Sequence, residues 1–359
     1  MNPRLNLRLS EVASGIEPVS EEWRQKAREY IKNLAMPQDS LGELLILAEQ
    51  IAAIKRSLKP SVSHKTVVTM AGDHGVVAEG VSAYPQEVTP QMVDNFVSGG
   101  AAVNVLAAVA GARVIVVDMG VAADLSSLVE EGKIISCKIG YGTKNFARGP
   151  AMTREEAVQA LEAGIFIAGK LAGEGAELLA TGDMGIGNTT PSSAILAVFS
   201  GKPVQEVTGR GTGLDDEGLQ NKIRVIRQAL EINRPDPADP VDVLAKVGGY
   251  EIGGIAGLIL GAAYHRIPVL IDGFISSAGA LLAKHLAPLS LDYMIAAHQS
   301  MEPGHQLMLR ELGLKPLLNL NLRLGEGTGA ALAMNIVEAS CRIIGQMSTF
   351  DDAGVSKKL

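Results

Sequence analysis

Residues 177–191 read ELLATGDMGIGNTTP and carry the clearest structural signal in the chain. The apolar run 177–181 is predicted to be a strand, and a helix is expected over 190–200 because Pro191 suits a first helical turn. The glycines between them let backbone N–H groups turn outward at the helix start, where an anion binds well. No GK[ST] follows at Walker spacing, and the pattern is not a clean GxGxxG. We interpret the loop as a phosphate site, with a tight strand-to-helix turn as the alternative.

The same alternation of short strand, glycine loop and Ala-rich helix continues through the centre of the chain. It predicts an α/β protein with a Rossmann-like, mostly parallel sheet flanked by helices. Further strands are expected at 66–70, 113–118, 267–271 and 292–297, with weaker signals at 134–139 and 317–320. Further helices are expected at 89–110, 153–173, 214–231, 252–264, 274–287, 304–313 and 328–346.

The two ends of the chain are expected to form a smaller helical domain. Apolar residues recur at helical spacing over 21–34 and again after Ser40, and the last helix is predicted to pack on this pair. The expected division is an N-terminal helical part, an α/β catalytic domain and a C-terminal helix that completes the small domain, at 1–60, 61–329 and 330–359.

Composition excludes several classes of protein. The chain has 359 residues, of which 47% are hydrophobic and 20% charged, so a disordered protein is excluded. The net charge of −7 and the lack of a basic block argue against nucleic acid and membrane partners. No apolar run reaches the roughly 20 residues of a membrane span. Two distant cysteines, Cys137 and Cys341, indicate neither a disulfide framework nor a zinc cluster, and a cytoplasmic location is expected.

Polar, glycine-containing loops follow the predicted strands. They lie at 71–75, 182–190, 272–273 and 298–300. Because ligands of open parallel sheets bind beyond the carboxyl ends of the strands, these loops are expected to converge on one site.

Two more glycine loops lie outside these strand ends. The first, GRGTG at 209–213, precedes a helix in which Lys222 lies about two turns in, able to offer its charge to a phosphate. A solvated helix face is the alternative reading for Lys222. The second, LGEGTGA at 324–330, isolates Glu326 between glycines before an apolar helix. Burial would raise the pKa of this carboxylate and make it a general base; the alternative is a charge favoured by the helix dipole.

Two other groups of residues invite chemistry. Asp73-His74 suggests a metal-dependent phosphohydrolase, but the histidines show no metal-binding spacing and no metal is expected. The following loop places Ser82, Tyr84 and Gln86 where they could wall a small heterocycle, with an ordinary surface loop as the alternative.

Taken together, the motifs resemble one known family. AGDHGV with EGVSAYPQEVT, TGDMGIGNTTP, GRGTGLDDEG and LGEGTGAAL, in this order, resemble the nicotinate-nucleotide–dimethylbenzimidazole phosphoribosyltransferases of cobalamin lower-ligand assembly, over nearly the whole chain. The resemblance implies transfer of phosphoribose from nicotinate mononucleotide to 5,6-dimethylbenzimidazole, giving α-ribazole 5′-phosphate and nicotinate. It also implies a homodimer that needs no metal or other cofactor.

Carried over by position, the resemblance assigns roles to residues. Glu326 would be the general base, and Ser82, Tyr84 and Gln86 would face the benzimidazole. Asp183 would be the second catalytic residue, and it is a departure because the family more often has Glu there. The residues that would hold the phosphoribose are Gly185, Ile186, Gly187, Asn188, Thr189, Gly211, Lys222 and Ser300.

The chemistry agrees with a single base. Nicotinate leaves from a pyridinium as a neutral ring, so it needs no general acid. Glycosidases instead need two carboxylates. Two alternatives stay open: the same fold acting on another acceptor base, and a non-catalytic module that binds a nucleotide or a cobamide.

Overall fold

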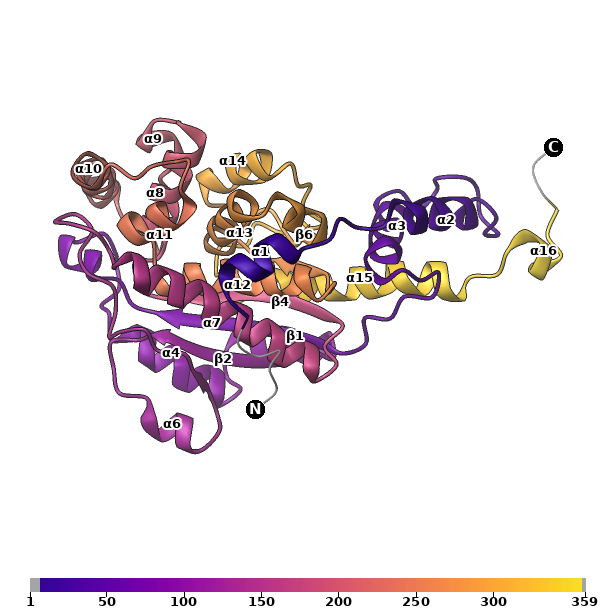
Figure 1. Ribbon diagram of the computed structural model, residues 1–359, viewed down its shortest axis with the longest axis horizontal. Coiled ribbons are helices and arrows are strands. Elements are labelled where there is room, and N and C mark those ends of the chain that lie inside the picture. The colour runs from indigo at the N-terminus through magenta and orange to yellow at the C-terminus, as the bar shows by residue number, and fades with distance from the viewer. Residues whose placement is uncertain (1–6, 357–359) are drawn as a thin grey trace.

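A six-stranded parallel sheet forms the centre of the protein (Figure 1). The computed structural model describes residues 7–356. The strand order is β3-β2-β1-β4-β5-β6, so the order reverses between β1 and β4, where an open α/β sheet binds its ligands. The predicted α/β, Rossmann-like class is therefore confirmed. The strands are β1 (Lys65–Gly72), β2 (Arg113–Gly120), β3 (Ile135–Ser136), β4 (Leu178–Met184), β5 (Val269–Ile271) and β6 (Met294–Ala296).

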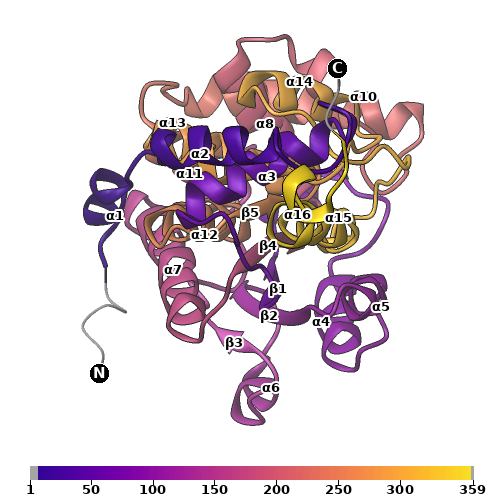
Figure 2. The ribbon, with the colours of Figure 1, turned by 90° about the vertical axis from the view of Figure 1, so that its right-hand side faces the viewer.

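Helices cover both faces of the sheet. Side chains alternate along β1, so Val68 and Met70 join one apolar core while Val67 and Ala71 join another. Figure 2 shows α7 and α12 on one side of the sheet and α4 and α5 on the other. The helices of these layers and of the loops are η2 (Gly75–Glu79), α4 (Val88–Val97), α5 (Ala102–Val109), α6 (Ser126–Glu130), α7 (Arg154–Gly173), α8 (Thr189–Ser200), α9 (Val204–Val207), α10 (Asp216–Asn233), α11 (Pro240–Val247), α12 (Tyr250–Tyr264), α13 (Phe274–Leu286), η3 (Pro288–Tyr293) and α14 (Pro303–Leu312).

A helical lobe projects from this α/β body (Figure 1). It contains α2 (Glu21–Ile31), α3 (Glu43–Lys55) and the last turns of α15 (Thr328–Gln346), which share a third apolar core; α16 (Phe350–Ala353) follows. The first helix, α1 (Leu9–Gly15), packs instead against α12 and α7, and the first turns of α15 pack on the sheet. The lobe thus begins after α1 and takes only the end of α15.

Two expected elements differ from the structure. The helix expected at 89–110 is two helices, α4 and α5, because Gly99 adopts a φ of +78° and the chain turns there. By length and hydropathy alone Val88–Val109 could span a membrane, but both helices pack against the sheet. The strand expected at 317–320 is also wrong: this segment makes a single bridge from Leu318 to His298.

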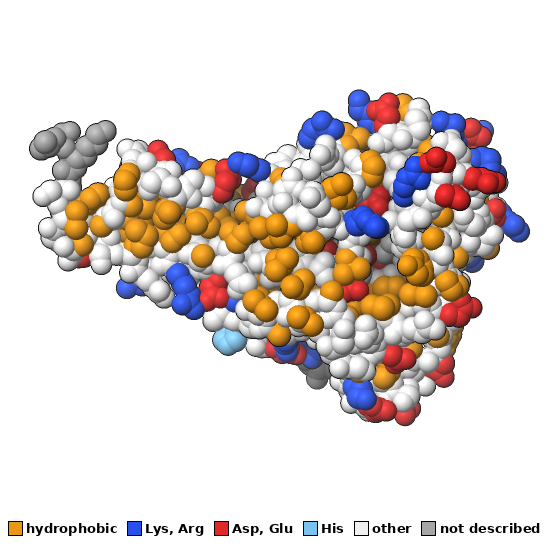
Figure 3. Space-filling view, turned by 180° about the vertical axis from the view of Figure 1, so that it is seen from behind, with side chains coloured by type: hydrophobic (Ala, Val, Ile, Leu, Met, Phe, Trp, Pro, Cys, Tyr) orange, Lys and Arg blue, Asp and Glu red, His pale blue; other side chains and the backbone are white. Residues whose placement is uncertain are grey.

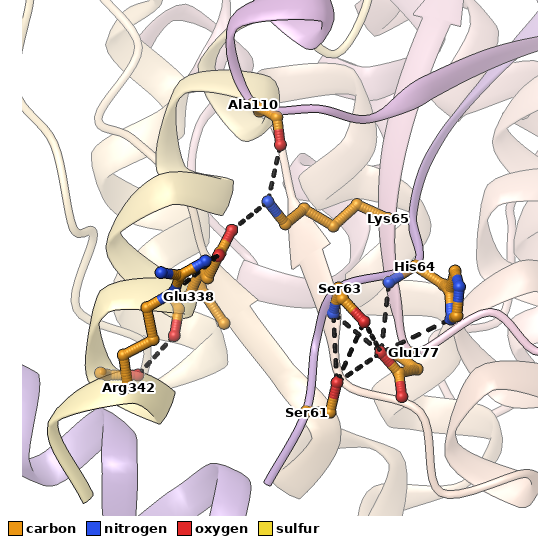
Figure 4. Close-up of polar contacts among 10 residues, drawn as sticks. Ser61, Ser63, His64, Lys65, Ala110, Glu177, Glu338 and Arg342 are labelled. Atoms are coloured by element: carbon orange, nitrogen blue, oxygen red, sulfur yellow. Dashed lines mark hydrogen bonds and ion pairs between the residues drawn. The ribbon is translucent and has the colours of Figure 1, made fainter. Parts of the chain in front are cut away.

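Polar clusters join the lobe to the amino ends of the strands (Figure 4). Lys65 is buried at the start of β1 and donates to the Ala110 carbonyl at 2.6 Å and to the carboxylate of Glu338 in α15. Nearby, the carboxylate of Glu177 accepts hydrogen bonds from segment 61–64, which connects the lobe to β1.

Candidate active site

A pocket of about 470 Å³ lies beyond the carboxyl ends of β4, β5 and β6. The loops after these strands converge there as expected, together with both additional glycine loops. The predicted loop at 71–75, which follows β1, does not by contrast line the pocket. The lining residues are Tyr84, Val88, Met92, Asp183, Met184, Gly185, Ile186, Asn188, Thr189, Gly211, Thr212, Gly273, Phe274, Ile275, His298, Ser300, Glu302, Arg323, Leu324, Gly325 and Glu326.

The glycine loop after β4 forms one end of the pocket. Asn188 directs its side chain to Asp183, donating to Oδ2 at 3.0 Å, so no side chain caps the amino end of α8. Gly187 has a φ of +88° and supports the loop from behind, against Val77. The Thr190 N–H already bonds to the Gly187 carbonyl and Pro191 has no N–H, so the phosphate role predicted for this loop rests on the remaining N–H groups of the helix start.

Lys222 comes from α10 and lies behind this end of the pocket; like Gly187, it does not line the pocket itself. Its side chain is fully buried, and Nζ donates to the Thr189 hydroxyl at 2.6 Å beside Gly211. Burial lowers the pKa of Lys222 to about 8, although the charge of Glu302 opposes this. The alternative of a solvated helix face is therefore wrong, and a buried ammonium group stands next to the glycine loops.

Glu326 sits at the switch point of the sheet in an unusual backbone conformation. Gly325, Glu326 and Gly327 have φ values of +85°, +64° and +98°, a left-handed run that glycine favours and glutamate does not. The hydroxyl of Thr69 on β1 donates to the Glu326 carbonyl at 2.9 Å. The flanking glycines and the hydrogen bond from β1 thus fix the backbone from which the Glu326 side chain projects.

The environment of the Glu326 carboxylate favours its neutral form. The side chain is buried, and Oε2 accepts the Val103 N–H at the start of α5, at 3.3 Å. Burial raises the pKa of Glu326; the Val103 N–H opposes the shift, and the charge of Asp272 adds to it. A carboxylate of this kind is a competent proton acceptor near neutral pH.

Asp183 lies next to this base at the end of β4. Its Oδ1 is buried without a hydrogen-bond partner. Burial raises the pKa of Asp183 well above its ordinary value, and the charges of Asp272 and Glu251 act in the same direction. Asp183 and Glu326 are therefore not equivalent, and Asp183 is the more strongly disposed to stay protonated.

The segment expected to face an acceptor base only partly lines the pocket. Tyr84 lines it and is half exposed, whereas the Ser82 hydroxyl donates to the Tyr84 carbonyl at 3.0 Å. Gln86 points to Asp73 instead. Neither Ser82 nor Gln86 is brought to the pocket, and their place is taken by Val88 and Met92 of α4 together with Met184.

Several lining residues escaped sequence reasoning. Ser300 lines the pocket as expected, but Glu302 and Arg323 join it from the same side. Glu302 follows the predicted loop at 298–300, and Arg323 precedes the glycine loop at 324–330. This closeness in sequence is the only signal that could have indicated them. Met92 of α4, which the sequence analysis did not single out, also lines the pocket.

Asp73 and His74 are engaged elsewhere. Asp73 accepts the Ala122 N–H at 2.8 Å, and His74 Nε2 lies 2.8 Å from Glu251 Oε1 in a fully buried pair. Within residues 7–356, no three His, Cys, Asp or Glu side chains are grouped as a metal site would require. These contacts give the phosphohydrolase hypothesis no support.

Comparison with known proteins identifies the class to which this fold and pocket belong. A family model described as phosphoribosyltransferase matches residues 16–355, so the chain is a phosphoribosyltransferase. It is 60% identical over 342 residues to the nicotinate-nucleotide–dimethylbenzimidazole phosphoribosyltransferase of Syntrophotalea carbinolica, covering 95% of this chain and 97% of the relative. With the enzyme of that name from Geobacter sulfurreducens the identity is 57% over 349 residues, 97% and 98% of the two chains.

A solved structure shows the same likeness. The crystal structure of CobT from Thermus thermophilus superposes with a TM-score of 0.90 at 48% identity, covering 94% of this chain and 100% of that one. The chain therefore belongs to the nicotinate-nucleotide–dimethylbenzimidazole phosphoribosyltransferase family, as its motifs predicted.

Proposed function

We propose that this enzyme transfers 5-phosphoribose from nicotinate mononucleotide to 5,6-dimethylbenzimidazole, giving α-ribazole 5′-phosphate and nicotinate. The names of its relatives support the two substrates. The observation that carries the mechanism is Glu326, a buried carboxyl group that lines the pocket together with Asp183 and Glu302 and is held there by its left-handed loop. Acceptors other than 5,6-dimethylbenzimidazole remain the alternative, because an aliphatic and methionine wall is not specific for one ring.

The phosphoribose is proposed to occupy the end of the pocket built by the glycine loops. The α8 amides and the Lys222 ammonium would bind the phosphate, and Ser300 would face the sugar. Gly187 would act by shaping the loop rather than by contact. The full set proposed for this role is Gly185, Ile186, Gly187, Asn188, Thr189, Gly211, Lys222 and Ser300.

The acceptor would lie against Tyr84, Val88 and Met92. Its unprotonated ring nitrogen attacks C1′ as the bond from C1′ to the pyridinium nitrogen breaks, and nicotinate leaves with that electron pair. Attack from the opposite face inverts C1′ from β to α. The remaining ring N–H of the acceptor becomes acidic and passes its proton to Glu326. Most of the acceleration comes from holding both reactants in line.

Asp183 is proposed to assist as a neutral acid. Because a second negative charge beside Glu326 and Asp272 is unfavourable, Asp183 keeps its proton and offers a hydrogen bond to a substrate through Oδ1. Its shorter side chain, where the family more often has Glu, leaves more room at this point of the pocket.

The assembly is proposed to be a homodimer in the cytoplasm. Figure 3 shows apolar side chains running along the lobe and onto the body. Val105 and Val109 on α5 are 59% and 70% exposed, and the pocket residue Leu324 is 59% exposed. A second copy covering such a surface would also close the pocket. Analytical ultracentrifugation tests the dimer.

We also propose that the lobe and the body are the two domains of the chain.

The reaction is tested by incubating the protein with nicotinate mononucleotide and a panel of bases. We expect release of nicotinate and an α-riboside phosphate, identified by mass spectrometry and NMR, with 5,6-dimethylbenzimidazole among the best acceptors. A β-riboside would exclude inversion, and no product from any base would refute the proposed reaction.

The base is tested by Glu326→Gln. This change keeps the side chain's size but removes its proton affinity, so kcat is expected to fall about 10²- to 10⁴-fold while nucleotide binding is retained. Asp183→Asn is the matched control, because an amide can still donate a hydrogen bond, and it should lose about tenfold or less. Full turnover by the Glu326 variant would remove the assigned base.

A further inference from the structure

Asp272 is a buried carboxylate that does not line the pocket but lies directly behind it. It follows β5 and faces the amino end of α15. Its Oδ1 accepts the Ala330 N–H at 2.8 Å, and the N–H groups of Gly327 and Gly329 act on the carboxyl group by lowering its pKa. One side chain thus gathers backbone donors from the segment that directly follows Glu326.

These N–H donors belong to the loop of Glu326, whose backbone conformation has to be fixed by contacts with other parts of the protein. A glutamate at a φ of +64° is strained, and it persists only where its surroundings fix the backbone. Asp272 fixes the loop after Glu326, and the Thr69 hydroxyl fixes the Glu326 carbonyl from β1. The loop also packs closely: a Cβ at Gly182 would stand 2.2 Å from that carbonyl oxygen.

Burial raises the pKa of Asp272, while the His298 ring and the backbone N–H groups oppose this shift. Its Oδ2 has no hydrogen-bond partner, and the nearest basic group is the His298 ring, whose Nε2 lies 3.7 Å from Oδ1. The groups that face Glu326 come from every neighbouring element. They are Asp183 at the end of β4, Asp272 after β5, Arg323 on the same loop and the amino end of α5.

We propose that Asp272 is a positioning residue for the transfer reaction: by accepting the Ala330 N–H it holds the left-handed loop that presents Glu326. The proposal rests on the proposed function, in which Glu326 accepts the acceptor's proton. The hold on the loop is the geometric effect, and an ionised Asp272 would also add to the burial that raises the pKa of Glu326.

The experiment separates these effects by measuring kcat and KM between pH 5 and pH 9 for three variants. Asp272→Asn keeps the shape but removes the charge. Thr69→Val removes the other hold on the loop and changes no charge. Asp118→Asn is the matched control: Asp118 is an equally buried carboxylate, on β2, paired with Lys138 at 3.1 Å and outside the pocket.

Activity requires ionised Glu326, so it rises with pH through the pKa of that group. For Asp272→Asn we expect kcat about tenfold lower, both KM values within about twofold, and the rising limb moved to lower pH by about one unit. Thr69→Val should lower kcat without moving the limb, and Asp118→Asn should do neither.

The proposal would be overturned if Asp272→Asn left the rising limb of the pH–activity profile in place, or if it changed KM alone and not kcat. If that variant does not fold, Asp272→Glu decides: its longer side chain cannot accept the Ala330 N–H in the same geometry, so an unchanged kcat would overturn the proposal. Failure of the proposed function looks different: the Glu326→Gln enzyme would turn over normally.

Discussion

A buried lysine binds a phosphate electrostatically only while it is protonated, and Lys222 is close to losing that proton at ordinary pH. Burial lowers its pKa to about 8, so the charged form dominates below this value and is lost above it. The KM for nicotinate mononucleotide is therefore expected to rise above pH 8, by up to about tenfold per unit. Steady-state kinetics from pH 6.5 to 9.5 measure this.

The matched variant is Lys222→Arg, whose guanidinium stays charged throughout. Its KM should be higher at neutral pH, because its shape differs, but should no longer depend on pH in this range. A flat wild-type KM up to pH 9.5 would contradict a phosphate role for Lys222.

Single residues also show where sequence reasoning ends. Glu326 was predicted because its glycine neighbours isolate a carboxylate, and a local pattern of that kind survives folding. Glu302, Arg323 and Met92 were not predicted, because each enters the pocket only through the convergence of distant segments. Gln86 fits the base-binding pattern by type, yet the fold turns it to Asp73.

At the scale of elements, the phosphate loop depends on the backbone of Gly187. A Cβ there would approach a Val77 methyl carbon to 2.6 Å, at a φ of +88° that other residues rarely adopt. Gly187→Ala should therefore displace the loop and raise the KM for the nucleotide about tenfold, a weakening of about 1.4 kcal/mol. Isothermal titration calorimetry with the nucleotide measures the loss directly.

Gly201→Ala is its control. Gly201 also has a positive φ, +64°, but a Cβ there meets nothing within 4 Å. It should cost about 1 kcal/mol of stability without changing nucleotide affinity. Equal binding losses in both variants would show that the effect is a general one of stability.

Element boundaries were predictable where a local cause sets them. The helix expected at 328–346 agrees with α15, since the glycine loop starts it, and 190–200 agrees closely with α8. The break between α4 and α5 was missed because Gly99 interrupts an otherwise continuous apolar pattern. Residues 317–320 have strand-like composition, but after the bridge at Leu318 they gain no further partner.

At the scale of the whole molecule, Glu177 fastens the connection between lobe and body. Burial alone would raise its pKa, but hydrogen bonds from Ser61, Ser63 and the His64 N–H outweigh this and lower it to about 2. A depressed carboxylate pKa stabilises the fold above the unfolded value of about 4.5, and this contribution is lost as the pH falls towards 2.

Glu177→Gln is therefore expected to lower the free energy of unfolding at pH 7 by about 1–2 kcal/mol, because the charged acceptor is lost. Near pH 2 the difference from wild type should shrink to zero. Urea unfolding at both pH values measures this. Glu131→Gln, which changes an exposed carboxylate away from the connection, is the control; a constant difference across pH would contradict the assignment.

The course of α15 has a mechanical consequence. Its 19 residues span about 28 Å, from the loop of Glu326 to the lobe core at Ile344, and the Lys65 ion pair grips it at Glu338. This ion pair ties α15 to the start of β1 partway along the helix. Because this tie lies between the two ends of α15, a displacement of the lobe core is expected to reach the loop of Glu326 only past a point that is fixed to the sheet.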